Sequence, residues 1–79
     1  MIEVLVPDLG LPDGVVPRIS GWLVRLGETV VEGDRLVELH RDEWTFDVTA
    51  PASGRLVQRL IARNRLAPTG APLGIIEPE

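Results

Sequence analysis

Residues 37–54, VELHRDEWTFDVTAPASG, contain two runs that favour β-structure on either side of a short polar segment. The first run begins just before this stretch, at Arg35, and ends at Arg41, and the second extends from Trp44 to Ala50. The segment that joins them, Arg41-Asp42-Glu43-Trp44, is short enough for a tight turn, and aspartate is a frequent turn residue. The stretch therefore predicts a β-hairpin with Glu43 exposed at its tip.

The second strand of this hairpin has one apolar and one polar face. Side chains two positions apart on a strand point to the same side. The apolar set, expected to face the core, is Trp44, Phe46 and Val48, and the polar set is Thr45, Asp47 and Thr49. We expect Trp44 to pack at the edge of the core beside the turn. The alternative is an exposed aromatic that binds a partner protein, because aromatic side chains often anchor interfaces.

The rest of the chain also favours strands separated by turns. The expected strands cover residues 2–6, 15–25, 29–31, 55–62 and 73–76, with glycine, proline and aspartate residues between them. Within the second of these, a proline and a glycine predict a bulge or an edge position. Seven or eight short strands with frequent turns predict an all-β sandwich or barrel.

Residues 56–66 also fit a helix. Their apolar residues at 56, 57, 60 and 61 recur with a helical period. Gly54 before the segment, Pro68 after it and the neighbouring strands favour a strand instead.

A short pattern recurs in the two halves of the chain. Gly33-x-x-Leu36 reappears as Gly70-x-x-Leu73, and at the matching place before it Gly27 is replaced by Asn64. Asparagine tolerates the left-handed backbone conformation that glycine adopts freely, so the exchange is physically reasonable. The repeat predicts two similar halves related by an approximate two-fold axis.

The composition limits the size and the chemistry of the protein. A chain of 79 residues without cysteine allows one small domain, residues 1–79, with no disulfide and no thiol nucleophile. The formal charge of −4 argues against nucleic acid as a partner. No apolar stretch approaches the about 20 residues that a membrane-spanning helix needs. Met1 to Pro7 has no positively charged leader, so we expect no signal peptide and a cytoplasmic location.

The basic residues are all of one type. Each of the eight is an arginine, and the chain contains no lysine. The α-amino group of Met1 is therefore its one primary amine.

Several segments together resemble the lipoyl and biotinyl carrier domains, especially the lipoyl domains of 2-oxo-acid dehydrogenase acyltransferases. The similar segments are Pro7–Gly10, Gly21–Val30, Gly33–Glu38, Val48–Gly54 and Gly70–Leu73, in order and at suitable spacing along nearly the whole chain. The resemblance implies a flattened barrel, or barrel-sandwich hybrid, of two four-stranded antiparallel sheets with quasi two-fold symmetry. It also implies protein partners such as dehydrogenase or acyltransferase subunits.

The hairpin departs from the family pattern. Family members have Glu-Thr-Asp-Lys-Ala at this place, with lipoate attached to the lysine at the tip of the turn, whereas this chain has His40-Arg41-Asp42-Glu43-Trp44. The biotinyl pattern Ala-Met-Lys-Met is missing as well. Glu43 is thus expected to occupy the attachment position, between Asp42 and Trp44. Because a carboxylate cannot supply the amine of an amide bond, we expect neither lipoate nor biotin.

No other residues predict an active site. Asp42, Glu43 and Asp47 could be a carboxylate group for metal or acid–base chemistry, but adjacent turn residues tend to point apart, so a solvated turn is the better interpretation. His40, without cysteine or a second histidine, is expected on the strand surface rather than in a zinc site. Ser53 lies in a turn sequence and lacks the pattern of a nucleophile elbow. We therefore expect no catalytic and no metal-binding residues, and no enzyme activity within this domain.

Two function hypotheses follow, with a third kept open. The first is a lipoyl-like domain without the attachment lysine that acts as a structural or docking module. The second is the lipoyl carrier domain of a dihydrolipoamide acyltransferase whose lysine was lost or mutated; the absence of all other lysines and the altered His40-Arg41 and Trp44 argue against a single exchange. The third is the lipoyl-like barrel of a membrane-fusion adaptor, although such barrels are usually interrupted by a long helical hairpin.

Overall fold

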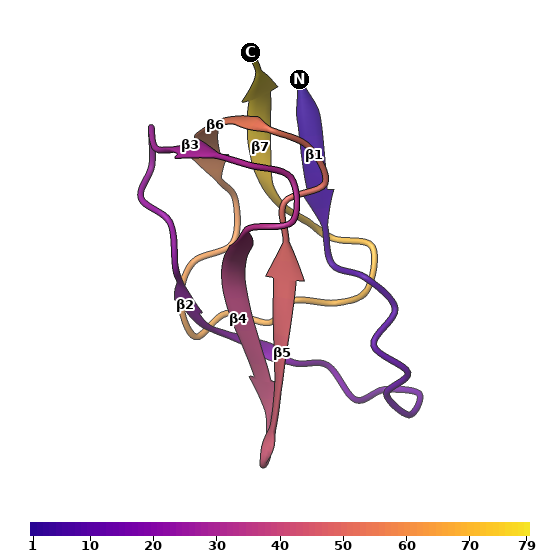
Figure 1. Cartoon of the computed structure of the whole chain (residues 1–79). Coiled ribbons are helices and arrows are strands. Elements are labelled where there is room, and N and C mark those ends of the chain that lie inside the picture. The colour runs from indigo at the N-terminus through magenta and orange to yellow at the C-terminus, as the bar shows by residue number, and fades with distance from the viewer.

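The computed structural model describes residues 1–79 and consists of strands and loops without a helix (Figure 1). The strands are β1 (Ile2–Leu5), β2 (Arg18–Trp22), β3 (Thr29–Val30), β4 (Arg35–Arg41), β5 (Trp44–Thr49), β6 (Gly54–Arg59) and β7 (Pro72–Pro78). The segment that also fitted a helix, residues 56–66, is a strand as far as Arg59 and a loop beyond it. The prediction of an all-β fold is confirmed.

The strands form two antiparallel sheets with the orders β1-β7-β6-β3 and β2-β4-β5. Apolar side chains from both sheets meet between them, so the molecule is a flattened sandwich with principal extents of 37 × 18 × 18 Å. The two chain ends lie side by side at one end of the long axis, and the β4–β5 hairpin projects at the other (Figure 1). The hairpin turn is therefore far from both termini.

The halves of the chain repeat the same backbone contacts, as the sequence repeat predicts. The N–H of Gly27 donates to the carbonyl of Leu56 at 2.7 Å, and in the other half the N–H of Asn64 donates to the carbonyl of Ile19 at 2.9 Å. Gly27 and Asn64 both have a positive φ, 88° and 70°. Asparagine therefore replaces glycine at a place where the backbone is left-handed, a region that asparagine enters more readily than most residues.

A second matched pair of contacts involves the recurring glycines. The N–H of Gly33 donates to the carbonyl of Ala50 at 2.9 Å, and the N–H of Gly70 donates to the carbonyl of Val6 at 2.8 Å. The pseudo-two-fold relation thus equates β4 with β7, β5 with β1 and β2 with β6.

The sheet that contains β2 has three strands and a single additional bridge, rather than four full strands. Leu66, at the place equivalent to β3, forms an isolated bridge with Arg18. The N–H of Ala67 donates to the carbonyl of Pro17 at 2.8 Å, but Pro17 has no N–H with which to return the bond. The proline thereby shortens the expected eighth strand to one bridge.

The bulge that was predicted within residues 15–25 is present. The register of β2 against β4 shifts between Ile19 and Gly21. The equivalent shift in β6 falls between Leu56 and Gln58. Bulges increase the local twist of a strand, so the matched pair bends both sheets in the same way.

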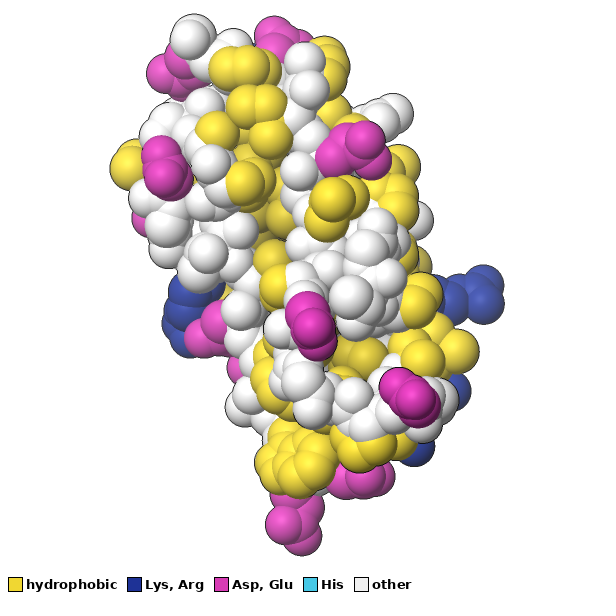
Figure 2. Space-filling model, turned by 90° about the vertical axis from the view of Figure 1, so that its right-hand side faces the viewer, with side chains coloured by type: hydrophobic (Ala, Val, Ile, Leu, Met, Phe, Trp, Pro, Cys, Tyr) yellow, Lys and Arg dark blue, Asp and Glu magenta, His cyan; other side chains and the backbone are white.

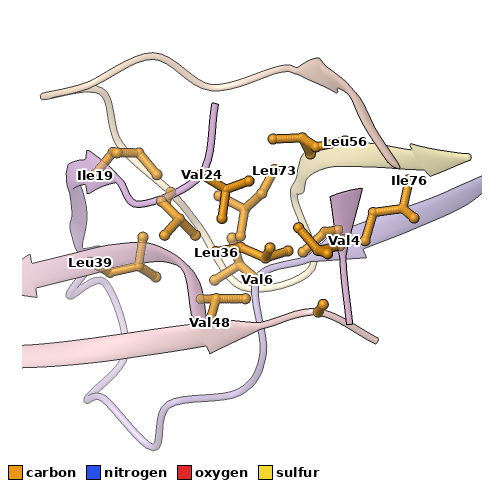
Figure 3. Close-up of a cluster of buried hydrophobic side chains, with 14 residues drawn as sticks. Val4, Val6, Ile19, Val24, Leu36, Leu39, Val48, Leu56, Leu73 and Ile76 are labelled. Carbon is orange, nitrogen blue, oxygen red and sulfur yellow. The ribbon is translucent and has the colours of Figure 1, made fainter. Parts of the chain in front are cut away.

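The core lies between the two sheets and is entirely apolar (Figure 3). It contains 14 buried residues, namely Val4, Val6, Ile19, Val24, Val30, Leu36, Val37, Leu39, Val48, Ala50, Leu56, Ala67, Leu73 and Ile76. On β5 Val48 is buried as predicted, and Phe46 is half-buried and packs against the cluster. No buried polar residue interrupts it, and its apolar side chains hold the two sheets together.

Candidate functional site

The hairpin turn has the geometry that the sequence predicts. Arg41 pairs with Trp44 at the end of the β4–β5 ladder, so Asp42 and Glu43 are the two turn residues. Asp42 has a φ of 54°, and aspartate is one of the few residues other than glycine that tolerate this region. Glu43 is exposed at the tip, at the far end of the molecule from the chain termini.

Trp44 is more exposed than expected. Its predicted packing at the edge of the core is wrong, because 56% of the residue is accessible and it lies outside the core cluster. Trp44 does share the alternation of Phe46 and Val48, but the hairpin projects beyond the facing sheet there, and its cross-strand neighbour is the charged Arg41. The alternative expectation, an exposed aromatic, describes its position.

The hairpin end of the molecule is acidic. Asp42 and Glu43 are exposed, and Asp47 on β5 lies opposite Glu38 on β4. Like charges directly across a sheet destabilise the pair, and a salt bridge of 3.2 Å from Arg35 to Asp47 offsets this. Figure 2 shows acidic side chains and a hydrophobic group together at this end, with arginines at the margins of the face in view.

His40 lies on β4 of the hairpin, opposite Thr45, at the strand position where the sequence interpretation placed it. Its Nδ1 shares a hydrogen bond of 2.6 Å with the hydroxyl of Ser20. His40, Arg18, Arg41 and Asp42 line a shallow notch of about 200 Å³. The Nε of Arg41 is buried and has no hydrogen-bond partner, with the Asp42 carboxylate 3.9 Å away.

The carboxylates of the hairpin have different surroundings. No three side chains of the histidine, aspartate or glutamate type lie together in a way that could hold a metal ion. Asp47 is directed to Arg35 on the neighbouring strand, and Asp42 is open to solvent. Ser53 lies in the bend that precedes β6, as the turn interpretation expects, and its hydroxyl accepts the N–H of Glu32 at 2.9 Å.

The residues that the sequence interpretation overlooked lie on other elements. Trp22 at the end of β2, and Arg59 and Arg63 in and after β6, line an open groove of about 740 Å³. Four arginines between residues 55 and 65, and the absence of any acidic residue from 48 to 76, were the available signal. Their meeting with Trp22 depends on the tertiary fold, which a local pattern does not reveal.

Comparison with known proteins identifies the family. The family model described as "Biotin-requiring enzyme", which covers biotin and lipoyl domains, matches residues 2–76. The dihydrolipoyllysine-residue succinyltransferase component of the 2-oxoglutarate dehydrogenase complex from Bartonella vinsonii subsp. berkhoffii is 34% identical over 76 residues, which are 95% of this chain and 18% of that protein. The dihydrolipoyllysine-residue acetyltransferase component of the acetoin cleaving system from Pseudomonas putida is 29% identical over 59 residues, 75% of this chain and 16% of that protein. The chain thus spans less than a fifth of the length of these curated relatives.

Solved structures support the same fold. The lipoyl domain of the 2-oxoglutarate dehydrogenase complex from Azotobacter vinelandii superimposes with a TM-score of 0.75 at 19% identity, covering 98% of this chain and 96% of that one. A single-chain, multi-domain long-chain acyl-CoA carboxylase matches with a TM-score of 0.67 at 23% identity, covering 81% of this chain and 6% of that one.

A pseudo-symmetric β-sandwich with a projecting two-residue hairpin defines a domain of the lipoyl and biotinyl type. Since the family model matches nearly the whole chain, the protein belongs to the biotin/lipoyl family, and it is related to the lipoyl domains of 2-oxo-acid dehydrogenase acyltransferases. The structure contains no helix with the length and apolar character that crossing a membrane requires.

Proposed function

We propose that this lipoyl-like domain carries neither lipoate nor biotin and acts as a structural or docking module. The observation that supports the proposal is the composition of the hairpin tip. Asp42 and Glu43 are the two turn residues, and the chain contains no lysine. In this proposal Glu43 stands at the position where the family pattern has its attachment lysine.

The residues at the tip do not fit the cofactors of the family. Attachment of lipoate or biotin forms an amide bond, in which an amine nitrogen attacks the activated carboxyl carbon of the cofactor. Glu43 presents a carboxylate, and the delocalised guanidinium of Arg41 is a poor nucleophile. The Met1 amine lies at the opposite end of the molecule (Figure 1). The tip therefore offers no group that could form the bond.

A docking role is supported by what the hairpin end does present. Trp44 exposes 56% of its surface beside the acidic turn, and large aromatic side chains are frequent anchors of protein interfaces. The matched relatives are named as components of dehydrogenase complexes or of an acetoin cleaving system. We therefore place the partners among dehydrogenase or acyltransferase subunits, and any enzyme activity in those subunits rather than in this domain.

A second candidate is the carrier domain of a dihydrolipoamide acyltransferase whose attachment lysine was lost or mutated. It is favoured by one observation, the retained two-residue turn with Asp42 ahead of the tip. In this case the recognition surface around the turn would still be that of a carrier. The two candidates differ in how the domain responds when a lysine is restored.

The direct test is co-expression with a lipoate ligase or a biotin ligase and the matching cofactor, followed by intact-mass measurement. We expect the unmodified mass in both cases. A lipoyl or biotinyl mass found on any side chain would overturn the proposal. Peptide mapping separates such a result from nonspecific labelling of the Met1 amine.

The docking half of the proposal needs a separate measurement. Purified dehydrogenase and acyltransferase subunits can be titrated with the wild-type domain and with Trp44→Ala. We expect binding by the wild type and a loss of about tenfold or more in affinity for the variant, as is typical of an aromatic anchor. Thr45→Ala, an exposed neighbour on the opposite face of β5, is the matched control. Absence of binding to every subunit would contradict the docking role without affecting the mass result.

A further inference from the structure

The groove beside β2 brings together residues from distant parts of the chain. The loop that follows β6 runs along β2 (Figure 1), and its residues 60–63 form one wall while Ser20, Gly21 and Trp22 form the other. The indole N–H of Trp22 donates to the carbonyl of Ile61 at 3.0 Å. The Nε of Arg63 donates to the carbonyl of Ser20 at 3.1 Å. These two bonds tie the walls together, so the groove is part of the folded structure.

Two arginines give the groove its charge. The guanidinium carbon of Arg59 lies 5.9 Å from the centroid of the Trp22 ring, in cation–π contact. Arg63 uses only its Nε in the bond to Ser20, so its two terminal nitrogens remain available. No carboxylate lines the groove. Glu38 on β4 pairs with Gly21 on β2, but Glu38 is not one of the lining residues.

The local charge contrasts with that of the whole chain. The formal net charge is −4, yet the segment from residue 48 to residue 76 contains no acidic residue and four arginines, Arg55, Arg59, Arg63 and Arg65. The acidic side chains gather elsewhere, including the hairpin end and the face in Figure 2. Complementary potentials of this kind select the charge of a partner and its orientation.

From these contacts we infer that the groove binds an extended acidic segment of a partner protein. The guanidiniums of Arg59 and Arg63 bind its carboxylates, because arginine forms charge-assisted and often bidentate hydrogen bonds with carboxylates. Leu60, which is 47% exposed, and the half-buried Ile61 provide apolar contacts for intervening side chains. The inference does not involve the hairpin and is independent of the proposal about the missing lysine.

Nucleic acid fits this groove less well than an acidic peptide. Tight binding of nucleic acid usually takes several phosphate contacts, and the groove supplies two guanidiniums on a protein of net negative charge. The indole of Trp22 is also half-buried, which limits stacking on a base. The guanidinium carbon of Arg59 lies over its ring, 5.9 Å from the centroid, and its Cη2 lies close to Gly74, where an added Cβ would be 3.2 Å from it.

The chain provides its own probe for an experiment. Trp22 and Trp44 are its two tryptophans, so a Trp44→Phe variant assigns the two indole N–H signals in an NMR spectrum. The ligand is a blocked hexapeptide of alternating glutamate and leucine, compared with the same peptide containing glutamine. We expect the glutamate peptide to shift the Trp22 signal but not the Trp44 signal, with a dissociation constant on the order of 1 mM or tighter. The glutamine peptide should have no effect.

Matched arginine variants locate the site. Arg59→Gln and Arg63→Gln should each weaken binding by about fivefold to tenfold, since each removes a charge-assisted contact. Arg55→Gln removes the same charge from β6 outside the groove, opposite Glu77, and should change the affinity by less than about twofold. Arg63→Lys, which keeps the charge and loses the Nε bond, should bind better than Arg63→Gln. The amide spectrum of each variant confirms that it is folded.

Four results would overturn the inference. One is no shift of the Trp22 signal at 10 mM peptide (about ten times the expected dissociation constant). Another is a loss of affinity in Arg55→Gln as large as in the two groove variants. The arginines would then attract the peptide through their overall positive potential rather than through contacts in the groove. The third is tighter binding of a single-stranded RNA of the same charge at the same salt concentration, which would make nucleic acid the ligand. The fourth is a Trp44 shift that grows with protein concentration, which would make the acidic hairpin of a second copy the occupant.

Discussion

The β4–β5 hairpin and the β7–β1 pair occupy equivalent places in the two halves of the molecule, yet they end differently. Their buried residues correspond across the pseudo-two-fold axis, as in Leu36 with Leu73, Leu39 with Ile76 and Val48 with Val4. β4 and β5 are joined through Asp42 and Glu43, whereas β7 and β1 run to the two chain ends (Figure 1). The core repeats because the fold requires it in both halves. The tip does not repeat, so its residues can change without disturbing the fold.

The largest effects should come from breaking the matched core. Leu36 and Leu73 are fully buried at equivalent positions, so Leu36→Ala and Leu73→Ala should each lower the free energy of unfolding by about 2 to 5 kcal/mol. Urea unfolding followed by tryptophan fluorescence measures both. A loss below about 1 kcal/mol at one position would show that the two halves are not energetically equivalent.

The tryptophans provide the next comparison, between a side chain that belongs to the fold and one that does not. Trp22 is half-buried, packs on the core and donates to Ile61, so Trp22→Ala should destabilise the domain by about 2 to 3 kcal/mol. Trp44 lies outside the core, and Trp44→Ala should cost less than about 1 kcal/mol. Calorimetry should show melting temperatures that differ by several degrees, since in a domain of this size about 1 kcal/mol shifts the Tm by roughly 4 to 8 °C. Equal losses would mean that Trp44 packs in solution.

A smaller effect is expected at the matched left-handed positions. Asn64→Ala and Gly27→Ala should each cost about 1 to 2 kcal/mol, the price of a left-handed backbone for a residue with a Cβ. At Gly27 an added Cβ would meet no atom within 4 Å, so the loss reports the backbone alone. Asn64→Gly is the control and should be neutral or slightly stabilising. If Asn64→Ala were harmless, the repeat would not reflect a shared backbone requirement.

Much of the fold was predictable because it depends on local patterns. Alternation placed Val48 in the core and Phe46 against it, and the recurrence of Gly33-x-x-Leu36 gave the two-fold relation. The bulge followed from the proline and glycine around β2. Each of these signals is visible in the sequence pattern itself, and the tertiary structure did not override it.

The errors come from features that depend on what lies opposite a residue in space. Trp44 has the alternation of a core residue, but no facing sheet covers the end of the hairpin. The eighth strand is a single bridge because Pro17, from the other half of the chain, cannot donate to Ala67. The groove likewise forms where Trp22 meets Arg59. These two residues occupy equivalent positions in the two halves of the chain, and their contact depends on the tertiary fold.

The smallest effect on stability, and the sharpest on function, is expected from restoring a lysine at the tip. Glu43 is exposed, so Glu43→Lys should change the free energy of unfolding by less than about 0.5 kcal/mol. The variant then has an amine in a two-residue turn that still begins with Asp42. If the missing amine were the one obstacle, a lipoate ligase would modify this variant fully.

We expect poor modification of the single variant instead. Lipoyl ligases recognise the shape of the turn as well as the amine, and Trp44 places a bulky exposed ring where the family pattern has alanine. Adding Trp44→Ala to Glu43→Lys should therefore raise the lipoylated fraction well above that of the single variant, as measured by intact mass under identical co-expression. Full modification of Glu43→Lys alone would show that Trp44 is no barrier and would favour the carrier that lost its lysine. Little modification of either folded variant would mean that the surface recognised by the ligase has itself diverged. The ligase would then find an amine in the right turn but lack the contacts around it.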